Sequence, residues 1–158
     1  MPTVLTKNSL KRKNFKPNEF FKSETAKKLG VVNYPNKEKE QEILTNLNLV
    51  ADMMQNIRDI LGYPVTINSA YRCKAVNDAV GSKDTSQHPQ GLACDFVCPK
   101  FGSPEEIVKH LFSLGFVADQ AFCEGSWVHI SRVSEENRMM YGTYLPDKNG
   151  RRRFKAIA

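Results

Sequence analysis

The sequence has 158 residues, of which 41% are hydrophobic and 25% are charged, and its formal net charge is +6. These values are typical of one compact globular domain with a hydrophobic core. No apolar run approaches the roughly 20 residues that span a bilayer, and the first residues lack the apolar stretch of a secretory signal. We therefore expect synthesis in the cytoplasm and no transmembrane segment.

The excess of positive charge lies at the start of the chain. Residues 1–30 contain eight Lys or Arg and two Asp or Glu, whereas residues 31–158 contain fifteen of each. A second basic cluster, residues 151–155, lies near the C-terminus. Such clusters attract anionic wall polymers, lipids or nucleic acid, and they also occur as simple solvated arms. Because no aromatic stacking platform or known motif accompanies them, we expect no nucleic-acid binding.

Hydrophobic periodicity and turn residues predict helices first and short strands later. The predicted helices cover residues 15–30, 37–61, 73–80 and 103–114. The predicted strands cover residues 64–69, 92–98, 117–123, 127–133 and 138–145. We expect an α+β fold in which N-terminal helices pack on a small antiparallel sheet. In this division, residues 1–14 are a basic flexible arm and residues 15–158 form a single domain.

Two histidines and one aspartate have the side-chain types of a catalytic zinc site. His88 lies in a polar loop, whereas Asp95 and His129 lie on predicted strands. Three protein ligands with a fourth position left for water is the usual plan of a hydrolytic zinc site. Each residue also has an ordinary alternative role: His88 as a surface residue, His129 as a hydrogen-bonded core residue and Asp95 as a buried hydrogen-bond partner.

Strand alternation makes the zinc interpretation geometrically feasible. The apolar face of strand 92–98 contains Leu92, Cys94, Phe96 and Cys98, which turns Asp95 to the other face. On strand 127–133, His129 shares a face with Trp127 and Ser131. If the two strands are neighbours, Asp95 and His129 converge, and Gly91 permits the turn that brings His88 to the same point.

Hydrolysis at such a site also needs a base for the attacking water and a cation for the developing oxyanion. Glu124 is the preferred base, because the short Gly125-Ser126 link allows it to fold back toward His129. Asp119 is the alternative carboxylate. Arg72 is the candidate cation, since arginine stays charged and binds carboxylates or oxyanions with two parallel hydrogen bonds.

These motifs together resemble the zinc D-alanyl-D-alanine carboxypeptidase family, which includes bacterial carboxypeptidases and phage endolysins that cut peptidoglycan. The family pattern is carried by the segments Ser69-Ala70-Tyr71-Arg72, Ser86-Gln87-His88, Gly91, Ala93, Asp95, Asp119-Gln120 and Trp127-Val128-His129. The resemblance covers residues 15–133. Two positions depart from the pattern: Ala70 replaces the usual glycine, and Ser126 replaces a residue that is acidic in one branch.

The resemblance implies that His88, Asp95 and His129 bind one Zn²⁺ and that Glu124 is the catalytic base. Arg72 would stabilise the oxyanion or bind a substrate carboxylate, and Ser86 would line the substrate cleft. The implied function is that of a monomeric zinc metallopeptidase of bacterial peptidoglycan, such as a phage or prophage endolysin that reaches the wall after release. The alternatives are a D-Ala-D-Ala carboxypeptidase or dipeptidase, and a non-catalytic, zinc-stabilised wall-binding or virion module.

Overall fold

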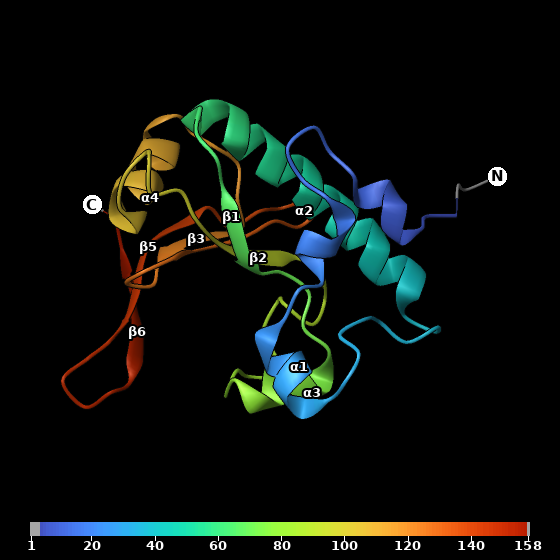
Figure 1. Ribbon diagram of the computed structural model, residues 1–158. Helices are drawn as coiled ribbons and strands as arrows, with labels where there is room; N and C mark the ends of the chain where they lie inside the picture. Colours follow the sequence, from blue (N-terminus) through green and yellow to red (C-terminus); the bar gives the residue numbers. More distant parts are fainter. Residues whose placement is uncertain (1–3, 158) are drawn as a thin grey trace.

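The computed structural model describes residues 4–157 and shows an α+β fold (Figure 1). The α-helices of this range are α1 (Glu24–Leu29), α2 (Glu40–Leu61), α3 (Lys74–Ala79) and α4 (Pro104–Ser113). Two short 3-10 helices, η1 (Lys7–Leu10) and η2 (Pro17–Phe20), precede them. None of the helices in residues 4–157 combines the length and apolar character that a membrane crossing requires.

The six strands form one sheet with the order β1-β2-β4-β3-β5-β6. They are β1 (Thr66–Ser69), β2 (Ala93–Val97), β3 (Gln120–Cys123), β4 (Val128–Ser131), β5 (Met140–Pro146) and β6 (Arg152–Ala156). The predicted α+β class is confirmed, but the sheet is mixed rather than purely antiparallel, because β5 runs parallel to β3. After β4 the chain passes to the far side of β3. There β5 runs in the direction opposite to β4, and because β4 is antiparallel to β3, β5 is parallel to β3.

Most predicted elements occur near their expected positions, with two differences. Residues 15–30 form η2 and the short helix α1 rather than one helix, and the Ser23 side chain caps α1 by accepting a hydrogen bond from the Ala26 amide at 3.0 Å. The basic C-terminal cluster forms β6, which pairs with β5 in a hairpin. This strand was not predicted.

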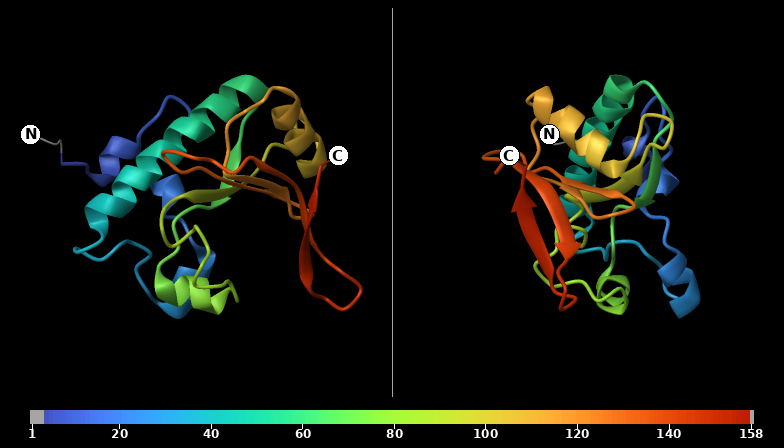
Figure 2. Two further views of the ribbon diagram at one scale, coloured as in Figure 1. Left: turned by 180° about the vertical axis from the view of Figure 1, so that it is seen from behind. Right: turned by 90° about the vertical axis from the view of Figure 1, so that its left-hand side faces the viewer.

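The hydrophobic core lies between the sheet and the two longest helices. Figures 1 and 2 show α2 and α4 over one face of the sheet. The buried side of α2 includes Leu47, Met54 and Ile57, and the facing strands contribute Cys94, Phe96 and Ile130. Because this apolar face packs against the helices, polar side chains such as Asp95 and His129 lie on the opposite face of the sheet.

Two parts of the chain project from that opposite side. Helices α1 and α3 contact each other and lie together on this side, and the β5–β6 hairpin extends beyond the sheet on the same side (Figure 2). The two projections therefore flank the face of the sheet to which Asp95 and His129 belong.

Residues 4–14 pack against α2, which differs from the flexible arm that we expected. Leu10 is fully buried in the same hydrophobic cluster as Phe15, so the fold shows no boundary after residue 14. The Arg12 guanidinium donates hydrogen bonds to Asp52 at 2.7 Å and to the Asn48 side chain at 2.5 Å. Leu5 and Asn14 add hydrogen bonds to the Gln41 and Gln55 side chains of the same helix. Residues 1–3 lie outside the described residues.

Candidate metal centre

Asp95 and His129 occupy directly opposite positions on two neighbouring strands. Strand β2 pairs with β4 in an antiparallel register that places Asp95 across from His129. Side chains opposite each other in such a pair point to the same face, so their polar atoms meet. The His129 Nδ1 atom lies 3.0 Å from Asp95 Oδ1.

His88 reaches the same carboxylate oxygen from the loop before β2. Its Nε2 atom lies 3.2 Å from Asp95 Oδ1, and its Nδ1 atom lies 2.7 Å from the backbone oxygen of Ala70. The loop can lie close to α2 because residue 91 is a glycine. Gly91 has a φ of +74°, and a Cβ at this position would lie only 3.0 Å from the Ile43 backbone oxygen. The turn at Gly91 and the contact with Ala70 thus position the imidazole.

The contact with Ala70 determines which nitrogen of His88 carries the proton. A carbonyl oxygen only accepts hydrogen bonds, so in the neutral imidazole Nδ1 is the donor and Nε2 presents its lone pair to Asp95. A lone pair that faces a carboxylate is repelled by it unless a cation, either a proton or a metal ion, lies between them. This arrangement is the one that metal-ligating histidines adopt, with the second ring nitrogen donating to a backbone carbonyl.

The three side chains form a cluster that could hold a metal ion. One ligand atom from each of His88, Asp95 and His129 lies within 4.8 Å of the others. Two imidazole nitrogens and a carboxylate oxygen are a donor set that Zn²⁺ accepts, with a further position left for water or substrate. His88 and Asp95 are buried, so an ion there would be shielded from solvent on the protein side. The donor chemistry and the His88 tautomer both fit zinc.

Arg72 contacts the second oxygen of the same carboxylate. Its Nη2 donates to Asp95 Oδ2 at 3.1 Å, and its Nε donates to Ser69 Oγ at 3.1 Å. Burial by itself raises the pKa of Asp95, whereas positive charge on protonated histidine neighbours holds the pKa well below its ordinary value. A metal cation between a neutral His88 and Asp95 would supply positive charge in the same place. Asp95 is therefore an anionic carboxylate fixed on both oxygens. Arg72 Nη1 has no hydrogen-bond partner among residues 4–157.

Glu124 lies beside the cluster, as the short link to Trp127 suggested. Its Oε2 atom is 4.0 Å from His129 Nδ1 and accepts a hydrogen bond from Trp127 Nε1 at 3.0 Å. Burial raises the pKa of Glu124; His129 lowers it, Asp95 raises it, and the net direction is upward. A partly buried carboxylate within reach of the cluster has the placement that a general base requires.

Asp119, the alternative base, is engaged elsewhere. Both of its oxygens accept hydrogen bonds from Arg138, the shortest at 2.6 Å, and Oδ2 also accepts one from Gln87 at 2.9 Å. The side-chain bond from Arg138 lowers the pKa of Asp119 below its ordinary value. A carboxylate with these partners is a poor proton acceptor. Through Gln87, it supports the loop that carries His88.

Ser86 lies at the start of the turn that presents His88. Its Oγ atom accepts a hydrogen bond from the His88 amide at 3.3 Å. This contact gives Ser86 a structural role in the loop, and its expected contact with substrate stays a prediction.

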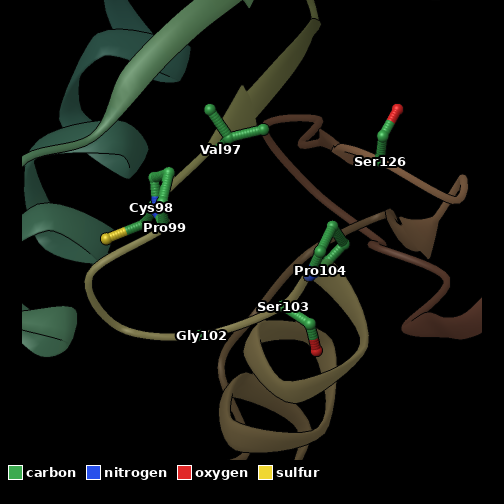
Figure 3. Close-up of a pocket in the computed structure, with 7 residues that line it drawn as sticks. All are labelled: Val97, Cys98, Pro99, Gly102, Ser103, Pro104 and Ser126. Atoms are coloured by element: carbon green, nitrogen blue, oxygen red, sulfur yellow. The ribbon is translucent and has the colours of Figure 1, made fainter.

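A separate pocket of about 410 Å³ lies at the end of β2 (Figure 3). It is lined by Val97, Ser126 and residues of the loop that enters α4, including Pro99 and Pro104. The pocket shares no residue with the His88, Asp95 and His129 cluster. Two of its lining residues are near the site in the chain: Val97 is two residues after Asp95, and Ser126 is two residues after Glu124.

Several residues next to the cluster were not anticipated. The Phe122 ring stacks on His129 with 5.7 Å between ring centroids, and Gln120 Oε1 lies 3.2 Å from His129 Nε2. From β6, Arg152 Nη1 lies 3.6 Å from Glu124 Oε1. Alternation along the strand 117–123 could have placed Gln120 and Phe122 on the site face. No local pattern indicates that β6 returns to this place.

Comparison with protein families identifies the class of protein. The family model of peptidase M15 matches residues 13–131, which is most of the chain, and the chain therefore belongs to this family. The match confirms the resemblance on which the sequence interpretation rests, and it contains all three residues of the cluster. A search of curated proteins gave no match.

Proposed function

We propose that this chain is a zinc-dependent peptidase that hydrolyses peptide bonds of bacterial peptidoglycan, in the role of a phage or prophage endolysin. The observation that supports it most directly is the convergence of His88 Nε2 and His129 Nδ1 on one oxygen of Asp95, at 3.2 and 3.0 Å, in a member of the M15 peptidase family. The proposal assigns these three residues as the ligands of one Zn²⁺.

A zinc ion in such a site polarises a carbonyl and makes a water acidic enough to attack near neutral pH. The protein supplies the proton transfers. Glu124 takes the proton from the attacking water as the new bond to the carbonyl carbon forms. When the carbon–nitrogen bond breaks, Glu124 passes that proton to the leaving amine.

The remaining polar groups orient the reacting atoms. Arg72 fixes Asp95 through Oδ2, and its Nη1 is available to donate to the developing oxyanion. Trp127 holds Glu124 through the indole N–H, which aims the carboxylate at His129. In this assignment Ser86 lines the cleft beside His88.

The place of action is part of the same proposal. Lys11, Lys13 and Lys16 in the N-terminal segment are exposed and can attract anionic wall polymers, whereas the Arg12 guanidinium already contacts Asp52. Removal of the lysine charges would then weaken binding to intact walls more at low salt than at high salt, because salt screens exposed charges.

Mass spectrometry of the fragments released from purified peptidoglycan tests the function. The zinc-loaded chain should release peptides with new termini, and the position of the new terminus separates the candidates. Cleavage within or between stem peptides supports an endolysin, whereas loss of the terminal D-Ala alone identifies a carboxypeptidase. Wall binding without any new terminus would contradict catalysis and identify a non-catalytic wall-binding module.

A further inference from the structure

The β5–β6 hairpin lies outside the region that the family model matches but contacts the candidate active site. The match ends at residue 131, and the hairpin begins at Met140. Phe154 of β6 and Tyr144 of β5 occupy opposite positions in the hairpin. Both rings pack on Phe122, at centroid distances of 5.1 and 5.7 Å, and Phe122 in turn stacks on His129.

Arg152 lies next to this aromatic contact. Arg152 is two residues before Phe154 on the same strand, so both side chains point to the same face of the hairpin. The guanidinium carbon lies 5.9 Å from the centroids of both the Trp127 and Tyr144 rings. Its Nη1 donates to the Tyr144 backbone oxygen at 3.0 Å. The guanidinium is therefore held in one place by two rings and a hydrogen bond.

The held guanidinium still has hydrogen-bond donors to offer. Its Nε and Nη2 atoms have no acceptor among residues 4–157, and the side chain is 39% exposed. Nε and Nη2 together form the edge of a guanidinium that binds a carboxylate with two parallel hydrogen bonds. Arg72 differs, because its Nε and Nη2 already donate to Ser69 and Asp95.

The geometry points to Arg152 as the residue that binds a carboxylate of the substrate, an inference that rests on the proposed peptidase function. Arg152 Nη1 lies 3.6 Å from Glu124 Oε1, so a carboxylate on its open edge lies close to the catalytic base. Stem peptides of peptidoglycan carry such groups on D-glutamate and at the C-terminal D-alanine. Arg152 thereby anchors the peptide on the hairpin side and presents the scissile bond to Glu124.

A double-mutant cycle between protein and substrate tests this inference. The full, zinc-loaded chain is assayed with the pentapeptide L-Ala-γ-D-Glu-L-Lys-D-Ala-D-Ala and with two forms in which either the glutamate carboxylate or the C-terminal carboxylate is an amide. Arg152→Met should raise KM for the free pentapeptide by about 10- to 100-fold, the effect of losing a charge-assisted pair, with kcat changed much less. One of the two amides should show the same rise with the native protein and no further rise with the variant.

Two further variants separate this role from a general effect of charge or folding. Arg152→Lys keeps the charge but not the forked donors, so it should retain only part of the affinity. Arg153→Met is the matched control, because Arg153 lies on the other face of β6 and pairs with Asp147 at 2.7 Å. It should leave KM unchanged.

Binding is measured independently of cleavage through fluorescence, since Trp127 is the single tryptophan of the chain and lies next to Arg152. Titration with the same three peptides should give weaker binding for Arg152→Met only when the recognised carboxylate is free. Such selectivity in a chain that cleaves neither these peptides nor purified peptidoglycan would refute the proposed peptidase but support the carboxylate site. An Arg152→Met variant that lowers kcat equally for all three peptides, or binds them all as the native chain does, would overturn the carboxylate site.

Discussion

The Nε2 atom of His88 and the Oδ1 atom of Asp95 lie 3.2 Å apart, and in the neutral imidazole neither atom carries a proton. The proton of His88 is on Nδ1, which contacts the Ala70 backbone oxygen at 2.7 Å. His129 Nδ1 meets the same carboxylate oxygen at 3.0 Å. A metal cation satisfies all three atoms together, whereas a single proton satisfies only one pair of them.

Asp95→Asn should therefore reduce zinc affinity by more than about 100-fold, since changes to groups that merely support a ligand already cost about 10- to 100-fold. The amide keeps the size of the side chain but removes its charge and places a donor near the histidines. Zinc affinity is measured by competition with a chelating dye. Asp147→Asn is the control, because Asp147 lies at the end of the β5–β6 hairpin and contacts Arg153. Equal affinities for Asp95→Asn and the native chain would exclude Asp95 as a ligand.

Arg72→Lys should lower zinc affinity by about 10- to 100-fold, because lysine keeps the charge but cannot contact Asp95 and Ser69 at the same time. In the native protein these two contacts are each 3.1 Å long. The same competition measurement, combined with kcat at saturating zinc, separates two functions of Arg72. A variant with normal zinc affinity and lowered kcat would assign Arg72 to the oxyanion alone.

Glu124→Gln should lower kcat by about 100- to 10,000-fold, the range expected for loss of a general base, while zinc remains bound. Glutamine can still accept the hydrogen bond from Trp127, so the loop should keep its conformation. Turnover is measured by release of amino groups from peptidoglycan, and bound zinc is measured in the same samples. Full turnover with zinc bound would show that the base lies elsewhere.

The contacts of Asp119 predict an effect on stability that depends on pH. The pKa of Asp119 is lowered in the folded protein, first by the side-chain bond from Arg138. Its stabilising contribution is therefore complete above the unfolded value of 3.8 and is lost as pH falls through the lower folded value. Asp119→Ala should cost about 1–2 kcal/mol at pH 7, because Arg138 is half exposed and solvent weakens the pair.

Urea unfolding of the native chain and Asp119→Ala, measured from pH 7 down to about pH 2, checks this expectation. The difference in the free energy of unfolding should stay constant above the unfolded pKa of 3.8 and shrink as pH falls below it. A difference that stays constant over the whole range would show that the Asp119 charge contributes nothing. A large loss of kcat with zinc affinity and stability intact would instead restore Asp119 as the catalytic base.

Local patterns predicted the parts of the fold that depend on short-range physics. The apolar spacing of α2 and the alternation of β2 and β4 follow from burial of one face, so they could be predicted from the residues themselves. Alternation turned Asp95 and His129 away from the core, and the structure places them opposite each other. That they bind zinc stays a prediction.

The C-terminal hairpin shows where such patterns fail. Every residue of β6 is exposed, and the strand consists largely of basic residues, so no apolar alternation marks it. An edge strand of this kind is held by backbone pairing with β5 and by contacts such as Phe154 on Phe122. Because these contacts join residues far apart in the chain, the place of Arg152 beside Glu124 could not be predicted.

The most direct test is a zinc titration of the chelator-treated chain during cleavage of purified peptidoglycan, with released peptides quantified by mass spectrometry. Cleavage should be absent without metal, should return in proportion to added zinc, and should saturate at one zinc per chain. The His129→Ala variant should show no return at the same zinc concentrations. Cleavage that persists after complete removal of metal, or that does not return with zinc in a folded native chain, would contradict a zinc peptidase built on His88, Asp95 and His129.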